Sequence, residues 1–73
     1  MGKLRKLSGR EVCTILARYN FFEVRQRGSH VVMQQRNENG TVTVPVPHHA
    51  ELRPGTLQAI IRQSGVPRFE FES

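Results

Sequence analysis

Residues 20–46 decide the fold of this chain: NFFEVRQRGSHVVMQQRNENGTVTVPV. Two pairs of turn-forming residues, Gly-Ser at 28–29 and Asn-Gly at 39–40, separate three runs that are rich in β-branched, aromatic and alternating polar residues. Such a pair between two such runs is typical of a two-residue β-hairpin loop. The stretch therefore predicts three antiparallel strands joined as a meander, the first over residues 21–27 and the second over residues 30–36.

The two loops also predict which residues face each other, because antiparallel partners are counted outward from the loop and share one face of the sheet. For the first hairpin we expect the pairs Arg27 with His30, Arg25 with Val32, Val24 with Met33, and Phe22 with Gln35. For the second hairpin we expect the pairs Met33 with Val46, Gln35 with Val44, and Asn37 with Val42.

The two hairpins agree on which face is buried, although their loops are independent signals. Pro45 cannot donate a ladder hydrogen bond, which places the third strand at an edge of the sheet. The apolar face collects Phe22, Val24, Val31, Met33, Val42, Val44 and Val46. The opposite face is polar and basic, and collects Glu23, Arg25, Arg27, His30, Gln34 and Arg36.

A first helix is expected before the strands. Ser8 and Glu11 have the spacing of a capping box, and the apolar residues that follow recur at helical intervals. They predict a helix over residues 8–19, which Asn20 can end because asparagine tolerates the left-handed conformation. The apolar stripe of this helix consists of Val12, Ile15, Leu16 and Tyr19.

A second helix is expected between Pro54, which suits a first turn, and Gly65, which suits a C-terminal cap. Because both helices need to cover the one apolar sheet face, the predicted fold class is α+β. It is a two-layer α-β-β-β-α sandwich, with a three-stranded antiparallel sheet and two helices on one face. We expect Phe69 and Phe71 to fold back onto this core. The apolar stripe of the second helix consists of Leu57, Ile60 and Ile61.

Length and charge narrow the classes of function. With 73 residues, the chain is expected to form one domain over residues 1–73, which excludes a multidomain enzyme with a separate cofactor domain. Eleven lysines and arginines against six acidic residues give a net charge of +5, and all of this excess lies in residues 1–36. Most of the cations are arginine, which suits bidentate phosphate contacts. A polyanionic partner such as nucleic acid is therefore expected on the basic sheet face.

Cysteine content and hydropathy predict the compartment. Cys13 is the only cysteine, so no intramolecular disulfide forms and an intracellular site is expected. We expect Cys13 to be a small buried or half-buried hydrophobe and not a nucleophile, because it lies close to the apolar stripe of the first helix. No apolar run approaches the roughly 20 residues of a membrane span. The sequence thus predicts a soluble cytoplasmic protein with no membrane partner.

His30 is the strongest candidate for chemistry, because the register places it on the polar face beside Arg27 and near Arg25. A histidine, with an ordinary pKa of about 6.5, can take a proton from a ribose 2′-hydroxyl or give one to a leaving 5′-oxygen. An arginine beside it can neutralise the charge that develops on the phosphate. Such cleavage needs no metal. The alternative interpretation is that His30 is an ordinary polar residue after a turn.

His48 and His49 lie in the loop after the third strand, next to Glu51, and suggest a metal site. They lack the i, i+4 spacing that places two imidazoles on one helix face, and Cys13 has no companion cysteine. We therefore predict no metal site and no cofactor. The segment is interpreted as a solvated loop in which His48 can contact RNA.

The order and spacing of several segments, over nearly the whole chain, resemble the HicA toxins of bacterial and archaeal toxin-antitoxin pairs. The hallmark of that family is Gly28-Ser29-His30 after the first strand. The other matching segments are RQR at 25–27, TVPV at 43–46, GTL at 55–57 and IIRQSG at 60–65.

The resemblance implies a double-stranded-RNA-binding fold, in agreement with the predicted sandwich. It also implies a metal-independent mRNA endonuclease whose catalytic histidine is His30, and a HicB-type antitoxin that covers this histidine. No motif of the family fixes a second catalytic residue, so the division between acid and base stays open. The oligomeric state is open as well.

The leading hypothesis is therefore the toxin of a type II toxin-antitoxin system that cleaves mRNA, with His30 as general acid or base. Two hypotheses from other classes remain, because a fold and a lone histidine do not establish catalysis. One is a non-catalytic RNA-binding module of the same fold, and the other is a protein-interaction domain that docks an acidic partner. The expected RNA-binding residues are Arg25, Arg27, Gly28, Ser29 and His48.

Overall fold

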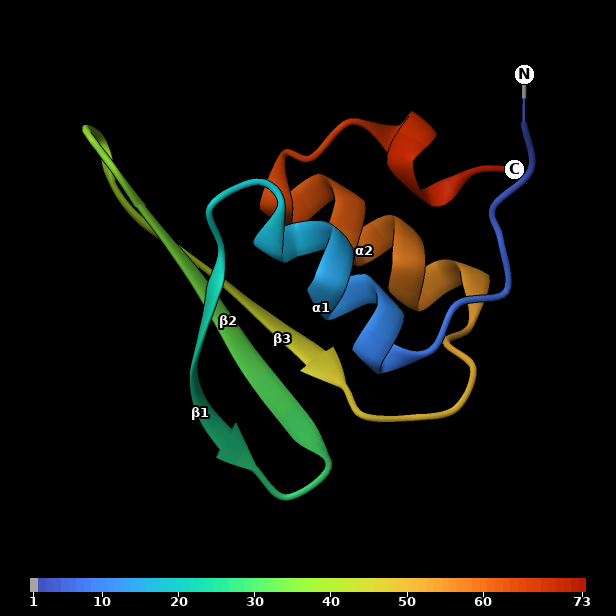
Figure 1. The fold of residues 1–73 in the computed structure, drawn as a ribbon, viewed down its shortest axis with the longest axis horizontal. Helices are drawn as coiled ribbons and strands as arrows, with labels where there is room; N and C mark the ends of the chain where they lie inside the picture. The colour runs from blue at the N-terminus through green and yellow to red at the C-terminus, as the bar shows by residue number, and fades with distance from the viewer. Residues whose placement is uncertain (1) are drawn as a thin grey trace.

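A computed structural model describes residues 2–73 of the chain (Figure 1). Its sheet has the strand order β1-β2-β3, and both helices lie on the same side of this sheet. The predicted α+β fold, a three-stranded antiparallel sheet with two helices on one face, is confirmed. The elements in chain order are α1 (Gly9–Ala17), β1 (Phe22–Arg27), β2 (His30–Asn37), β3 (Gly40–Pro47), α2 (Pro54–Ser64) and the 3₁₀ helix η1 (Arg68–Phe71).

The helix ends follow the signals in the sequence. Glu11 N–H donates to Ser8 Oγ at 3.0 Å and Ser8 N–H donates to Glu11 Oε1 at 2.9 Å, so the capping box of α1 is confirmed. Helix α1 ends two residues earlier than expected, and Asn20 then adopts the left-handed conformation with φ 69°. Helix α2 begins with Pro54 and ends at Ser64, and its C-cap Gly65 is also left-handed, with φ 72°.

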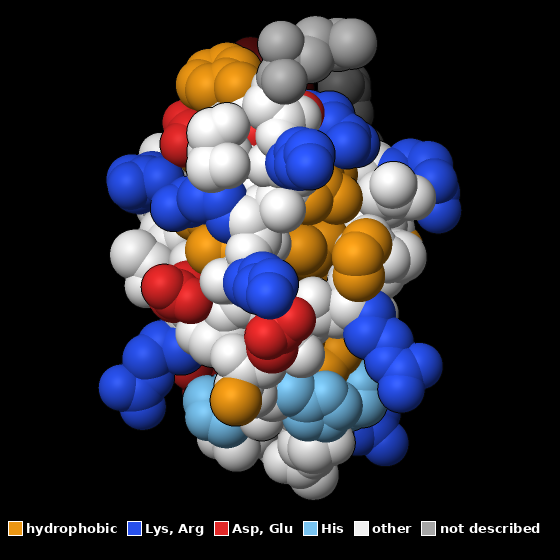
Figure 2. All heavy atoms as spheres, turned by 90° about the vertical axis from the view of Figure 1, so that its right-hand side faces the viewer, with side chains coloured by type: hydrophobic (Ala, Val, Ile, Leu, Met, Phe, Trp, Pro, Cys, Tyr) orange, Lys and Arg blue, Asp and Glu red, His pale blue; other side chains and the backbone are white. Residues whose placement is uncertain are grey.

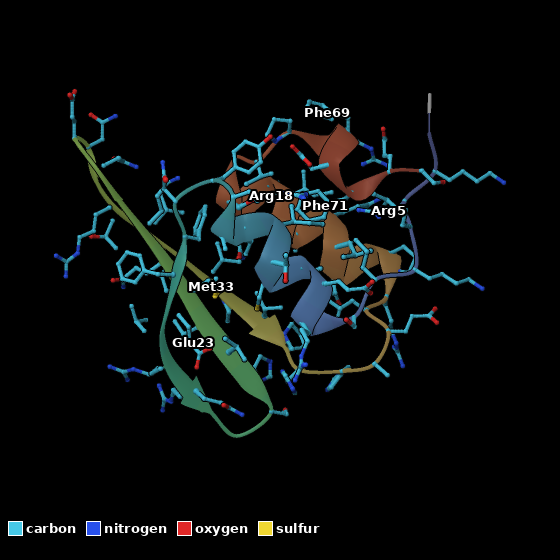
Figure 3. The ribbon with its side chains drawn as sticks, viewed as in Figure 1. Arg5, Arg18, Glu23, Met33, Phe69 and Phe71 are labelled. Atoms are coloured by element: carbon cyan, nitrogen blue, oxygen red, sulfur yellow. The ribbon has the colours of Figure 1, made fainter. Side chains whose placement is uncertain are left out.

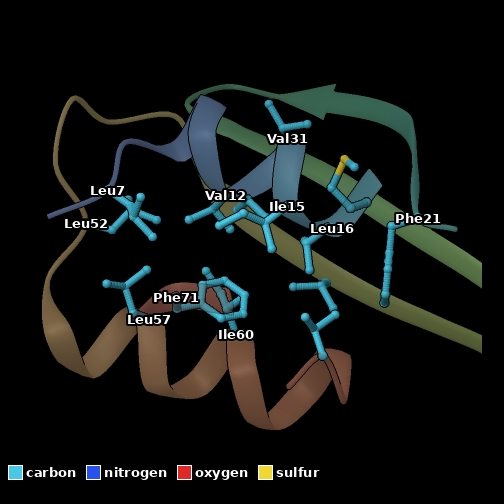
Figure 4. Packing of buried hydrophobic residues seen from close by; sticks show 14 residues of the cluster. Leu7, Val12, Ile15, Leu16, Phe21, Val31, Leu52, Leu57, Ile60 and Phe71 are labelled. Atoms are coloured by element: carbon cyan, nitrogen blue, oxygen red, sulfur yellow. The ribbon is translucent and has the colours of Figure 1, made fainter. Parts of the chain in front are cut away.

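The core lies between the helices and the inner face of the sheet, by which we mean the face toward the helices (Figure 4). Phe71 of η1 is fully buried in it, as expected, whereas Phe69 is 67% exposed and the expectation for that residue is wrong. The short 3₁₀ helix turns only one of its two rings inward. The buried apolar residues are Leu7, Val12, Ile15, Leu16, Phe21, Val31, Met33, Val44, Val46, Leu52, Leu57, Ile60, Val66 and Phe71.

The first hairpin has the expected register near its loop and a different one farther away. Arg27 faces His30 and Arg25 faces Val32, as expected. The register then shifts between Glu23 and Arg25, which makes Val24 the extra residue of a β-bulge. Beyond the bulge every pairing differs by one residue from the expected one. Glu23, not Val24, faces Met33, and Phe22 faces Gln34 instead of Gln35.

The bulge overturns the expected burial of β1. Phe22 is 46% exposed and Val24 is 41% exposed, so neither belongs to the core. Phe21, just before the strand, is buried in their place. Glu23, expected on the basic face, instead lies with Met33 on the inner side of the sheet (Figure 3). A one-residue shift reverses the face of each side chain, which explains all of these differences together.

The second hairpin is shifted by two residues from the expected register. Asn37 faces Gly40, so the loop consists of Glu38 and Asn39 and not of Asn39 and Gly40. The side chain of Asn37 accepts a hydrogen bond from Asn39 N–H at 2.8 Å, which favours this tighter placement. Because the shift is even, Val44 and its neighbours keep their expected faces. Strand β3 is an edge strand, as Pro45 predicts.

Among residues 2–73, no helix has the length and apolar character needed to cross a bilayer.

Candidate functional site

The outer face of the sheet, the face away from the helices, is uncovered and basic. Along each strand, the side chains that alternate with the inward-facing residues point to this face. Within the described residues, none of the strand residues on this face is acidic, because the bulge removes Glu23 to the inner side. The strand residues of the outer face are Phe22, Arg25, Arg27, His30, Val32, Gln34, Arg36, Thr41, Thr43, Pro45 and Pro47.

A groove of about 320 Å³ runs over this face. Gln34 and Thr43 lie in it with their side chains joined, since Gln34 Nε2 donates to Thr43 Oγ1 at 3.2 Å. Arg25 and Arg27 line one side, and neither takes part in the ion pairs formed within residues 2–73. The full lining is Val24, Arg25, Arg27, Val32, Gln34, Thr43 and Pro45.

The turn between β1 and β2 sets the position of His30. Gly28 has φ 55° and Ser29 has a negative φ, the pattern of a type II′ hairpin turn that requires glycine first. His30 is the first residue of β2 and faces Arg27 on one side and Pro47 on the other. Its side chain is exposed on the outer face. The structure therefore places the imidazole of His30 beside a guanidinium on the uncovered side of the sheet.

The loop from β3 to α2 closes against this turn. His48 N–H donates to the carbonyl oxygen of Ser29 at 2.5 Å, which brings the backbone of His48 next to the turn that carries His30. Figure 2 shows histidine side chains gathered at one end of the molecule, close to arginine or lysine side chains. The predicted site residues from 27 to 30 and His48 thus meet at one corner, while Arg25 lies farther along the groove.

The start of α1 braces the same loop. Gly9 N–H donates to the carbonyl oxygen of His49 at 2.9 Å. A Cβ on Gly9 would lie 2.1 Å from the carbonyl oxygen of Pro47 and 3.1 Å from the Cα of His48. Only glycine permits this approach, so Gly9 holds the helix against the segment that supports the His30 corner. Sequence reasoning missed this role, because a close contact between distant segments leaves no local signal.

The corner has the parts for proton transfer at a bound phosphate. Arg27 supplies a positive charge, and His30 supplies an imidazole that can accept or donate a proton. The side chain of His30 is exposed, so its ring is accessible to a ligand. No group of three or more His, Cys, Asp or Glu side chains with metal-binding geometry occurs in the same part of the chain.

Two other titratable groups lie away from this corner. Cys13 is half-buried, as expected, and burial is the larger cause that raises the pKa of its thiol, with the charge of Glu23 adding to it. A raised pKa disfavours the thiolate, which agrees with a packing role. At the other end, the hydroxyl of Tyr19 donates to the carboxylate of Glu70, and this bond is the largest cause that raises the pKa of Tyr19.

Residues 9–66 match the family model described as "HicA toxin of bacterial toxin-antitoxin". The matched region runs from the first residue of α1 past the end of α2 and contains every residue of the corner and of the groove. No match to the chain was found among curated proteins.

Proposed function

Since the chain belongs to the HicA toxin family of bacterial toxin-antitoxin systems, we propose that it is a metal-independent endoribonuclease that cleaves mRNA with His30 as general acid or base. It acts in the cytoplasm as the toxin of a type II pair. The single observation that supports this proposal most is the pairing of His30 with Arg27 on an uncovered face of the sheet, where none of the described strand residues is acidic.

The chemistry is an attack by the ribose 2′-oxygen on the adjacent phosphorus, which breaks the bond from phosphorus to the 5′-oxygen. The 2′-hydroxyl loses a proton and the leaving 5′-oxygen gains one, so the products are a 2′,3′-cyclic phosphate and a 5′-hydroxyl. His30 performs one of these two proton transfers. Arg27 faces His30 across the hairpin and stabilises the negative charge that builds up on the phosphate oxygens.

The turn and the loop position these groups. Gly28 and Ser29 form the turn that the RNA backbone approaches closely, since Gly28 has no side chain and a Cβ there would meet no protein atom within 4 Å. His48 is held beside Ser29 by its backbone hydrogen bond and is in place to contact the RNA. Arg25 extends the line of positive charge into the groove. These residues bind and orient RNA, and His30 carries the reaction.

The family implies an antitoxin as protein partner. We assign this role to a HicB-type antitoxin that covers His30. The exposure of His30 on an edge of the molecule suits such inhibition, because a protein that buries this corner blocks the reacting group directly. In this proposal the domain comprises residues 1–73 as one unit.

The experiment compares the purified protein with its His30→Ala variant on a long unstructured RNA in excess EDTA. We expect cleavage by the parent and none by His30→Ala, with equal helix and strand content by circular dichroism. His49→Ala is the matched control, since His49 is an exposed histidine of the neighbouring loop with no assigned role. Equal cleavage by His30→Ala would contradict the proposal. RNA binding without cleavage by the parent would favour a non-catalytic RNA-binding module.

A further inference from the structure

Phe22 is an exposed aromatic ring on the outer face of the sheet. It is 46% exposed, faces Gln34 in the register, and thus lies next to a residue that lines the groove. The bulge at Val24 is what turns Phe22 outward, since the expected register would bury it. A large ring that the fold turns to solvent, beside a groove with one basic side, suits a ligand with an apolar flat surface.

We propose that the outer face binds an unpaired stretch of RNA, with one nucleobase stacked on Phe22 and the next bases following the groove toward Arg27 and His30. This inference rests on the proposed endoribonuclease function and adds the form of RNA that the site takes. Proteins that hold single strands combine a positively charged groove with aromatic side chains on which bases stack. The groove and Phe22 supply both features on one face.

The lining of the groove matches the chemistry of a nucleotide strand. Its floor and sides combine apolar surface from Val24, Val32 and Pro45 with guanidinium groups from β1. Apolar surface suits the faces of bases, and guanidinium groups suit phosphates. No acidic strand residue of the described chain opposes a polyanion on this face. The positive charge of this face therefore favours RNA, a polyanion, over an uncharged apolar partner. The aromatic ring favours RNA whose bases are accessible.

The path has a length that suits several nucleotides. From Phe22 to Arg27 the sheet advances four ladder positions, matching Gln34 to His30 on β2, because Val24 is the extra residue of the bulge; this is on the order of 13 Å at the usual rise per residue. A stacked nucleic-acid strand advances about 3.4 Å per nucleotide, so the path spans about four nucleotides. His30 lies at the Arg27 end. A base stacked on Phe22 would thus anchor the strand at one end while the reacting phosphate lies at the other.

Duplex RNA does not fit this mode. Its bases are stacked on each other, and proteins recognise it by shape and by contacts to phosphates and 2′-hydroxyls. A ring such as Phe22 gains nothing from such a surface. The inference thus predicts a preference for unpaired RNA over a duplex of equal length.

The test uses tryptophan fluorescence, because the chain contains no tryptophan. Phe22→Trp and, as the matched control, Phe69→Trp are made in the His30→Ala background, which prevents cleavage during titration. Phe69 is also an exposed phenylalanine but lies in η1, away from the sheet (Figure 3). The probes are a 12-nucleotide oligouridine and an RNA duplex of the same length, both in EDTA.

We expect oligouridine to quench the tryptophan of Phe22→Trp and to leave that of Phe69→Trp unchanged. The duplex should cause little quenching in either variant. Phe22→Ala should weaken oligouridine binding by about fivefold to a hundredfold, the range that corresponds to the loss of one base stack. Phe22→Tyr, which keeps a stacking ring, should bind as the parent does.

Bound oligouridine without quenching, or equal quenching by the duplex, would overturn the inference. An affinity of Phe22→Ala for oligouridine equal to that of the parent would also overturn it. If Phe22→Ala then disrupted a complex with a protein, the surface would be assigned to a protein partner. The outcome is independent of the cleavage assay. If the parent cleaves RNA but Phe22→Trp shows no quenching, the proposed function stands and this inference fails. If oligouridine quenches Phe22→Trp but the parent does not cleave RNA, this inference stands and the proposed function fails.

Discussion

The contact between Gly9 and the end of β3 gives the sharpest prediction about the fold. In Gly9→Ala the new methyl carbon would lie 2.1 Å from the carbonyl oxygen of Pro47 and 3.1 Å from the Cα of His48. Both atoms belong to the backbone, so no side-chain rotation relieves the overlap. Either α1 or the segment after β3 has to move, and the hydrogen bond from Gly9 N–H to His49 is then weakened.

The magnitude follows from three contributions. Over-packing a close contact costs about 1–3 kcal/mol, and the weakened hydrogen bond costs about 1 kcal/mol. The better helix propensity of alanine returns up to about 1 kcal/mol. We therefore expect Gly9→Ala to lower the free energy of unfolding by about 2 kcal/mol, which is a fall of about 8–16 °C in the melting temperature of a domain of this size.

The assay is urea unfolding followed by far-UV circular dichroism, with thermal melts as a second readout. Gly55→Ala is the matched control, because Gly55 lies in the first turn of α2 and a Cβ there would meet no atom within 4 Å. That variant should gain up to about 1 kcal/mol. If Gly9→Ala is as stable as Gly55→Ala, the close packing of α1 against the end of β3 is wrong.

Three further predictions concern the helix cap, the core and the RNA contact. Ser8→Ala should lower the free energy of unfolding by about 1 kcal/mol at neutral pH. Because backbone and side-chain hydrogen bonds to Ser8 hold the pKa of Glu11 below its ordinary value, part of this difference should disappear as the pH falls through that lowered pKa. A difference that stays constant with pH would contradict the capping box. In urea unfolding, Phe71→Ala should lower the free energy of unfolding by about 3–5 kcal/mol. Phe69→Ala should change it by less than about 0.5 kcal/mol. Similar losses in the two variants would contradict the finding that Phe71 is buried and Phe69 is exposed. Arg27→Ala should reduce the slope of log K against log salt for single-stranded RNA binding by about 0.7, and an unchanged slope would remove Arg27 from the phosphate contacts.

Local signals predicted the elements well. The capping box at Ser8, the left-handed Asn20 and the C-terminal Gly65 are all confirmed, because each is a short-range interaction between residues close in the sequence. The Gly-Ser turn gave the correct pairing of Arg27 with His30 for the same reason. These two residues form the part of the candidate site that sequence alone placed side by side.

One error, the two-residue shift of the second hairpin, goes with a local hydrogen bond of Asn37 in the turn, and the others lie where tertiary packing decides. The sequence around β1 allows two alternating patterns, one that buries Phe22 and Val24 and one that buries Phe21. Only the packing of Phe21 into the core selects the second pattern, which contains the bulge. The sequence therefore assigned Phe22 to the core and hid the aromatic ring of the outer face. The role of Gly9 was hidden too, since its steric partner at Pro47 is distant along the chain. The groove is lined in part by Val24, the bulge residue that the expected register assigned to the apolar face.

The measurement that tests the central claim most directly is the chemistry of the cut. An RNA with a single preferred cleavage position is compared with the same RNA carrying one 2′-deoxy nucleotide at that position, both in EDTA. His30 acting on a 2′-hydroxyl attack predicts a 2′,3′-cyclic phosphate and a 5′-hydroxyl from the first RNA and no cut in the second. Cleavage of the 2′-deoxy substrate at the same position, leaving a 5′-phosphate, would contradict the account.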